Sequence, residues 1–259
     1  MSIKIRDTIL GEKVLICAPV IGCMDDDIIE GVKAIKEKPV DIIEWRADYY
    51  KERFNSDKVN GMLRRIRKEC GALPVIFTYR TVHEGGESEC EGNNFITDDY
   101  YFELLKGVAC GGYADIIDIE VLAFAEDAVR KLIQYIKEKN SISLASNHHF
   151  DKTPSNNEMR KVFKYMHECG ADILKLAVMP HSNMDVLRLM EVTAEAAAEY
   201  KEPLITMSMG KAGLITRVCG SLTGSAMTFA SVSSESAPGQ IPADTVAGLL
   251  DLFGNTKEN

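Results

Sequence analysis

The chain has 259 residues, of which 46% are hydrophobic, so it is long enough to bury a large core. Its 39 acidic and 30 basic residues give a net charge of −9, which argues against nucleic acid or an anionic membrane as the main partner. No apolar run approaches the roughly 18 residues of a membrane span, and the first residues lack the apolar stretch of a secretory signal. The 7 cysteines are scattered and form no Cys-x-x-Cys pair, which predicts reduced thiols in a cytoplasmic protein.

Short apolar runs alternate along the chain with segments that resemble amphipathic helices. The spacing is about 30 residues, which is the length that a strand–helix unit needs. We therefore predict parallel strands that close into a (β/α)8 barrel, a TIM barrel, as one domain over residues 1–259, with an N-terminal β-hairpin that turns near residues 10–12. An open doubly wound sheet is the alternative, although the chain has no Gly-x-Gly-x-x-Gly motif and no phosphate-loop motif. The apolar runs that mark the expected strands are 14–20, 42–45, 74–79, 116–121, 142–145, 173–179, 204–207 and 226–232.

Two of the expected helices have clear signals. Residues 128–139 carry apolar side chains at helical spacing along one face. Ser155 followed by Glu158 is the pattern of a capping box, and Gly170 is placed to end the helix that this box begins. These signals support the alternation of strands and helices on which the barrel prediction depends.

Polar residues gather where the predicted strands end, and the carboxyl ends of the strands form the functional face of a barrel. Glu44 and Arg46 end the second strand, Arg80 ends the third and is followed by Glu84, and His148 ends the fifth. Glu44 and Arg46 share a face because they are two residues apart in an extended segment. They could close the barrel mouth as a salt bridge or contact a ligand directly, and the sequence leaves both open.

Lys175 lies in the middle of an otherwise apolar strand, on the same face as Ile173, Ala177 and Met179. An ammonium that points into a barrel loses hydration, which favours the neutral amine. The neutral amine is the form that attacks a carbonyl to make a Schiff base. The alternative is a structural lysine paired with an inward carboxylate such as Glu120, and placement alone leaves both interpretations open.

His148 ends the strand next to the one that carries Lys175, and neighbouring strands lie about 4.8 Å apart. An imidazole titrates near neutrality, so His148 could take and return a proton beside Lys175. His149 points to the opposite face, where we expect a hydrogen-bonded residue without a catalytic role. Arg217 follows the seventh strand and carries a fork that suits a carboxylate or phosphate. The small polar residues 231–240 are either an ordinary surface loop or a lid over the barrel mouth.

Taken together and in this order, these residues resemble the type I 3-dehydroquinate dehydratases, and the resemblance covers nearly the whole chain. It depends on the combination of short motifs, since each tripeptide alone is weak. The motifs are Glu44-Trp45-Arg46, Thr78-Tyr79-Arg80 with Glu84-Gly85-Gly86-Glu87, Ser146-Asn147-His148, Lys175 with Met179-Pro180, Thr206-Met207-Ser208-Met209-Gly210, Arg217, and Ser236-Ala237-Pro238-Gly239-Gln240.

The resemblance implies a cytoplasmic hydro-lyase, usually a homodimer, that converts 3-dehydroquinate to 3-dehydroshikimate in the third step of chorismate biosynthesis. It implies no metal and no diffusible cofactor, and the sequence contains no His-Glu-x-x-His motif or EF-hand spacing. The matching positions are Lys175 for the Schiff-base lysine, His148 for the general acid/base, Glu84 for its supporting carboxylate, Arg217 for the substrate carboxylate, Glu44, Arg46 and Arg80 for substrate hydroxyls, and Ser236 and Gln240 for lid contacts.

Two positions depart from the family pattern. His149 stands where relatives often carry aspartate, and Ala18 stands where some carry a serine that could contact the substrate. Two other functions remain open at this point. A class I aldolase would also need an inward lysine, and a non-catalytic barrel could bind a small carboxylate with the same arginines.

Overall fold

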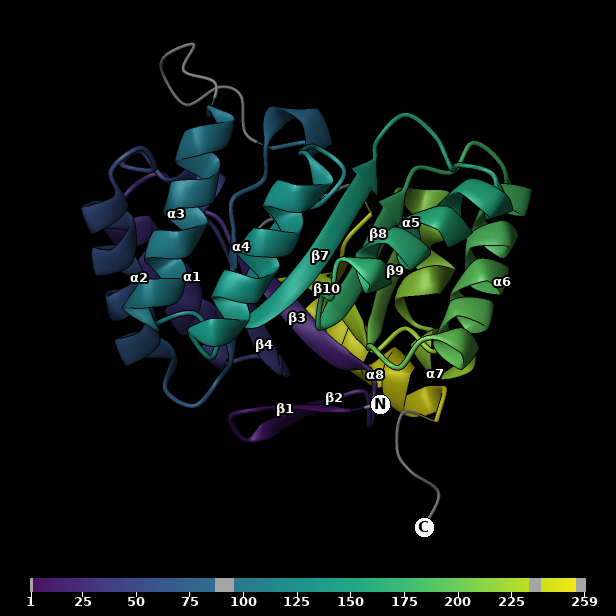
Figure 1. Ribbon diagram of the computed structural model, residues 1–259. Helices are drawn as coiled ribbons and strands as arrows, with labels where there is room; N and C mark the ends of the chain where they lie inside the picture. Colours follow the sequence, from purple (N-terminus) through teal and green to yellow (C-terminus); the bar gives the residue numbers. More distant parts are fainter. Residues whose placement is uncertain (1, 87–95, 233–238, 255–259) are drawn as a thin grey trace.

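A computed structural model describes residues 2–86, 96–232 and 239–254. Eight parallel strands curl around a common axis, and a helix follows each of them on the outside (Figure 1). The predicted (β/α)8 barrel is confirmed. The strands are β3 (Leu15–Val20), β4 (Ile42–Arg46), β5 (Val75–Thr78), β6 (Ile116–Glu120), β7 (Ile142–His149), β8 (Ile173–Val178), β9 (Leu204–Ser208) and β10 (Met227–Ser231). The helices are α1 (Asp25–Lys36), α2 (Ser56–Cys70), α3 (Asp98–Gly111), α4 (Glu126–Glu138), α5 (Asn156–Glu168), α6 (Asn183–Glu199), α7 (Gly220–Thr223) and α8 (Ala243–Leu252).

Hydrogen bonds join the strands in the order β10-β3-β4-β5-β6-β7-β8-β9, and the short strand β11 (Ile241–Pro242) adds to the free side of β10. The two ends of this order meet where β9 begins. A parallel bridge joins Leu204 to Ser225 there, and the Ala226 amide donates to the Leu204 carbonyl oxygen at 2.7 Å. The sheet therefore closes at its amino-terminal end.

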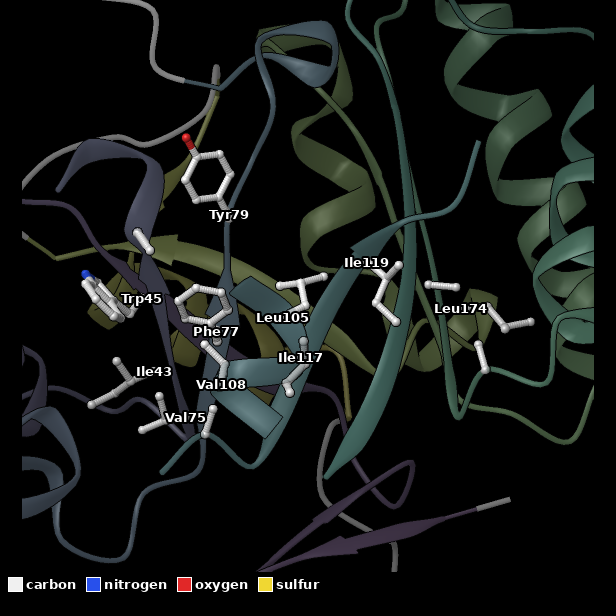
Figure 2. Close-up of a cluster of buried hydrophobic side chains, with 14 of the residues drawn as sticks. Ile43, Trp45, Val75, Phe77, Tyr79, Leu105, Val108, Ile117, Ile119 and Leu174 are labelled. Atoms are coloured by element: carbon white, nitrogen blue, oxygen red, sulfur yellow. The ribbon is translucent and has the colours of Figure 1, made fainter. Parts of the chain in front are cut away.

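Alternation along the strands creates two apolar layers, as a period of two requires. One layer lies between the sheet and the helices. Figure 2 shows part of it, where Ile43, Phe77 and Ile117 from three neighbouring strands lie in one buried cluster with Leu105 and Val108 of α3. The other layer fills the barrel interior. Its buried members include Leu15, Cys17, Ile42, Ile76, Ile116, Leu144, Ile173, Ile205, Met227 and Phe229.

The N-terminal hairpin consists of β1 (Ile3–Ile5) and β2 (Thr8–Leu10), which pair antiparallel. Ile5 and Leu10 belong to the interior cluster, so the hairpin covers the amino-terminal end of the barrel (Figure 1). The turn expected near residues 10–12 is wrong. The chain turns at Arg6 and the following residue, with Arg6 at φ 54°, because the Leu10 side chain is buried and belongs to the second strand.

The two best-marked helices form as predicted. Helix α4 buries the apolar face expected for residues 128–139. Helix α5 begins with a capping box between Ser155 and Glu158, and Gly170 takes φ 80° just beyond its end. Strand β7 ends in His148 and His149, as predicted, and His149 still pairs with Val178 of β8.

The cysteines in the described ranges are all free. Cys17, Cys70, Cys169 and Cys219 are buried, and Cys23 and Cys110 are exposed. Over the same ranges, no helix combines the length and apolar character that a membrane crossing needs.

Candidate active site

The carboxyl ends of the strands surround a cavity, and the side chains predicted from the sequence meet there. Ser236 lies outside the described residues. The other predicted site residues, Glu44, Arg46, Glu84, Arg80, His148, Lys175, Arg217 and Gln240, all line this cavity. The apolar walls of the cavity come from residues to which the sequence assigned no role in the site, which are Phe150, Ala177, Met207, Met209 and Phe229.

Lys175 points into the barrel from β8 and is 4% exposed. Its Nζ lies 3.6 Å from Asp118 Oδ2 and 3.8 Å from Glu44 Oε1, distances longer than a direct hydrogen bond. It also lies 4.4 Å from the centroid of the Phe229 ring. The amine is therefore buried beside two carboxylates and still faces the cavity.

Glu120 is not the carboxylate beside Lys175, so that alternative partner was wrong. Glu120 accepts hydrogen bonds from the Thr81 amide at 2.7 Å and from Arg80 Nη1 at 3.0 Å. Barrel strands are tilted, so the side chain of β6 that comes near Lys175 is two residues earlier, at Asp118.

Asp118 connects the two buried cations of the site. It accepts from Arg80 Nη2 at 2.8 Å and from Ser146 Oγ at 2.7 Å. Burial alone would favour the neutral acid, but the charges of Arg80 and Lys175 outweigh it and hold the pKa of Asp118 below its ordinary value. Asp118 is therefore an ionised carboxylate between two cations. The sequence showed it on the strand but did not identify it as a site residue.

His148 and Glu84 form a buried pair in which Nδ1 lies 2.7 Å from Oε2. The other carboxylate oxygen of Glu84 accepts from Asn147 Nδ2 at 2.9 Å. Burial, followed by the charges of Arg80 and Lys175, holds the pKa of His148 well below its ordinary value. Burial and repulsion from nearby carboxylates raise the pKa of Glu84 to about 8. The imidazole is therefore neutral, and the Glu84 carboxyl changes its protonation near pH 8.

Two of the three predicted arginines are fixed by carboxylates of the protein. Arg46 meets Asp48 through two parallel hydrogen bonds, at 2.8 Å from Nε and 2.7 Å from Nη2. Arg80 donates to Asp118 and Glu120 and also to Ser146 Oγ at 3.0 Å. Both side chains reach the cavity wall, and their orientation is set by these bonds.

Arg217 and Gln240 reach the cavity from loops. Arg217 ends a 3-10 helix (Lys211–Arg217), is 1% exposed, and donates from Nη1 to the Phe229 carbonyl oxygen at 3.3 Å. Gln240 is buried and comes directly before β11. A guanidinium at the cavity wall is suited to a ligand carboxylate.

The two departures from the family pattern lie outside the cavity lining. Ala18 belongs to the apolar cluster between sheet and helices, so a serine there would face away from the cavity, and the expected loss of a substrate contact is wrong. His149 is half-buried on the outer side of β7, and burial lowers its pKa. Its Nε2 has no hydrogen-bond partner among the described residues. Those residues also contain no cluster of His, Cys, Asp and Glu arranged to hold a metal ion.

A buried amine, a neutral imidazole and several arginines around the mouth of a (β/α)8 barrel define a class of enzymes that act on small anionic carbonyl compounds. The comparison with known proteins narrows this class. The family model for type I 3-dehydroquinase matches residues 16–257. The chain belongs to that family and is therefore a hydro-lyase with 3-dehydroquinate dehydratase activity. This membership decides against the aldolase and the non-catalytic barrel.

Three relatives illustrate the similarity. The 3-dehydroquinate dehydratase of Clostridium kluyveri is 41% identical over 253 residues, which is 97% of each chain. The crystal structure of the enzyme from Geobacillus kaustophilus superposes with a TM-score of 0.94 at 34% identity, covering 100% of this chain and 98% of that one. The type I enzyme of Clostridium difficile, solved with covalently modified comenic acid, gives a TM-score of 0.91 at 37% identity, covering 98% and 97%.

Proposed function

We propose that this enzyme dehydrates 3-dehydroquinate through a Schiff base on Lys175, with His148 as the general acid and base. The observation that carries the proposal is that a buried amine and an imidazole, from adjacent strands, line one cavity. The Clostridium difficile relative was solved with covalently modified comenic acid, which supports a reactive group in an enzyme of this family.

The reaction follows from these two groups. Lys175 passes a proton to His148, and the neutral amine adds to the ketone carbon. The carbinolamine hydroxyl then takes that proton from His148 and leaves as water, which gives an iminium. The iminium withdraws electrons and acidifies the neighbouring C–H, whose proton His148 takes at Nε2, leaving an enamine. The enamine expels the hydroxyl group, which leaves as water with the proton from His148. A second water then hydrolyses the conjugated iminium, which releases 3-dehydroshikimate and the free amine.

The Glu84 carboxyl supports both directions of proton transfer. When it is ionised, it accepts Nδ1–H, and Nε2 of His148 is left as a base. When the pair holds a second proton, Nε2 carries a hydrogen and can act as an acid. A Glu84 carboxyl whose pKa is raised to about 8 has both its protonated and its ionised form available close to neutrality.

The remaining predicted residues bind the substrate in this proposal. Arg217 holds the carboxylate and so fixes which hydrogen faces His148. Contacts to the hydroxyl groups come from Glu44, Arg46 and Arg80, and contacts from the loop after β10 come from Ser236 and Gln240. The same resemblance supports a cytoplasmic homodimer that acts in the third step of chorismate biosynthesis, without a metal or diffusible cofactor.

Trapping of the intermediate tests the mechanism directly. Borohydride added with 3-dehydroquinate should reduce the iminium and leave an adduct on Lys175 that peptide mass spectrometry locates. Lys175→Ala should give neither adduct nor turnover, as followed by the ultraviolet absorbance of the conjugated product. His148→Ala should still form the adduct but turn over about 10² to 10⁴ times more slowly. An active enzyme that yields no adduct on Lys175 would refute the Schiff base.

A further inference from the structure

Asn147 and His148 are neighbours in β7, so their side chains start on opposite faces of the sheet. Both nevertheless contact the same carboxylate. Asn147 Nδ2 donates to Glu84 Oε1 at 2.9 Å, and His148 Nδ1 lies 2.7 Å from Glu84 Oε2. A carboxylate held at one oxygen by one residue and at the other by the next residue has very little rotational freedom.

The lengths of two strands explain this arrangement. The last pair between β6 and β7 is Glu120 with Ser146, whereas β7 continues along β8 as far as His149. Among the described residues, no strand pairs with the β6-facing edge of β7 beyond Ser146. A 3-10 helix (Val82–Glu84) contacts this end of β7 and places its carboxylate at the edge, where it can reach side chains from both faces.

Within this contact the Asn147 amide has only one productive orientation. A carboxylate oxygen accepts hydrogen bonds, so the NH₂ group must face Glu84. This orientation leaves the other end of the amide unsatisfied, because Asn147 Oδ1 is buried and has no hydrogen-bond partner in the described part of the chain. Buried polar atoms without a hydrogen-bond partner are rare in proteins. The hydrogen bond from Nδ2 to Glu84 explains why the Asn147 amide keeps an orientation that leaves Oδ1 without one.

We propose that Asn147 is a positioning residue for the acid–base pair, whose amide fixes the Glu84 carboxylate so that one oxygen faces His148 Nδ1. The inference rests on the proposed function, in which His148 moves the proton. Other charged groups also face Glu84. Arg80 Nη1 lies 3.7 Å from Oε2, and Glu120 acts on the carboxyl through repulsion. The Asn147 hydrogen bond acts with Arg80 and against Glu120 to favour the ionised carboxylate.

The pH dependence of turnover separates positioning from a purely structural role. Asn147→Leu removes the hydrogen bond at similar volume, so the pair should hold its second proton to higher pH. The rising limb of kcat against pH should move up by about one unit, which lowers kcat roughly tenfold on that limb. Asn147→Asp keeps the shape of the side chain and adds repulsion, so it should move the limb further in the same direction. The isosteric aspartate also provides a second variant if leucine disturbs folding.

A matched control exists on the surface. Asn156 Nδ2 donates to Glu191 Oε2 at 2.8 Å, its Oδ1 also lacks a hydrogen-bond partner in the described residues, and it lies on α5 outside the cavity lining. Asn156→Leu should leave the pH profile in place. A uniform loss of kcat at every pH in the Asn147 variants, or an unchanged profile, would overturn the inference.

Borohydride trapping separates this inference from the proposed mechanism. Wild-type enzyme and both Asn147 variants should form the Lys175 adduct. Failure of the wild-type enzyme to form it contradicts the Schiff base, whereas a normal adduct with an unshifted pH profile contradicts only the role of Asn147.

Discussion

Removal of the Asp118 charge should destabilise this protein strongly. Asp118→Asn keeps the shape of the side chain but removes the charge that faces Arg80 at 2.8 Å and Lys175 at 3.6 Å. Both cations are about 4% exposed, so water cannot replace the lost partner. Breaking a buried ion pair by removing one partner costs about 3–5 kcal/mol, and we expect the free energy of unfolding to fall by that amount at neutral pH.

Urea unfolding followed by circular dichroism measures the loss. Glu195→Gln is the control, because Glu195 makes two hydrogen bonds to Arg160 at 2.8 and 3.0 Å while both side chains are more than 40% exposed. An exposed pair of this kind contributes at most about 1 kcal/mol. If Asp118→Asn costs no more than Glu195→Gln, the buried charges are not acting as argued.

The pH dependence of the same measurement provides an independent check. Folding lowers the pKa of Asp118, so its contribution to stability is complete above the unfolded-state pKa of about 3.9 and is lost as the pH falls through the lower folded-state value. The difference in unfolding free energy between wild type and Asp118→Asn should therefore be constant at neutral pH and shrink in acid. A difference that grew as the pH fell would contradict the lowered pKa.

Two further predictions concern the site. A Cβ at Gly86 would lie 2.0 Å from the Arg80 carbonyl oxygen, so Gly86→Ala should displace Glu84 and lower kcat by about 10², with no comparable loss for Gly61→Ala, where the added atom meets nothing within 4 Å. Steady-state kinetics on both variants test this prediction, and equal kcat values for the two would show that the turn at Gly86 accepts an added Cβ without displacing Glu84. Arg217→Lys exchanges a planar fork for a point charge, so kcat/KM should fall at least about tenfold, mainly through KM. An unchanged KM would mean that another group binds the substrate carboxylate.

The sequence predicts the barrel well because its signals are local and repeated. Alternation in the strands and helical spacing in residues 128–139 both report which face is buried. The hairpin turn was misplaced because Arg6 is not a residue type that marks a left-handed turn, whereas Gly11 is, and Gly11 does take φ 101° just after the second strand.

The sequence predicted which residues line the candidate site better than it predicted which of them contact one another. Periodicity is enough to place Lys175 inside the barrel, but the choice between Asp118 and Glu120 as its neighbour depends on strand tilt and stagger, which no single strand encodes. Arg46 shows the same limit. Arg46 pairs with Asp48, two residues later, where the chain leaves β4 in a 3-10 turn (Ala47–Tyr49). Glu44 lies at the same spacing on the other side, so spacing alone could not choose between the two carboxylates.

The contact between Glu84 and β7 lies furthest from what a linear pattern can show. It depends on the chain after β5 turning tightly at Gly85 and Gly86. It also depends on β6 being shorter than β7, which leaves the end of β7 beyond the reach of β6. Each of these is a difference between elements, whereas hydrophobic periodicity reports on one element at a time. The contact between Glu84 and His148 therefore depends on the relative lengths of β6 and β7 as well as on the two residue types. If the proposed mechanism holds, a change that lengthens β6 should shift the pH profile of kcat without altering either residue.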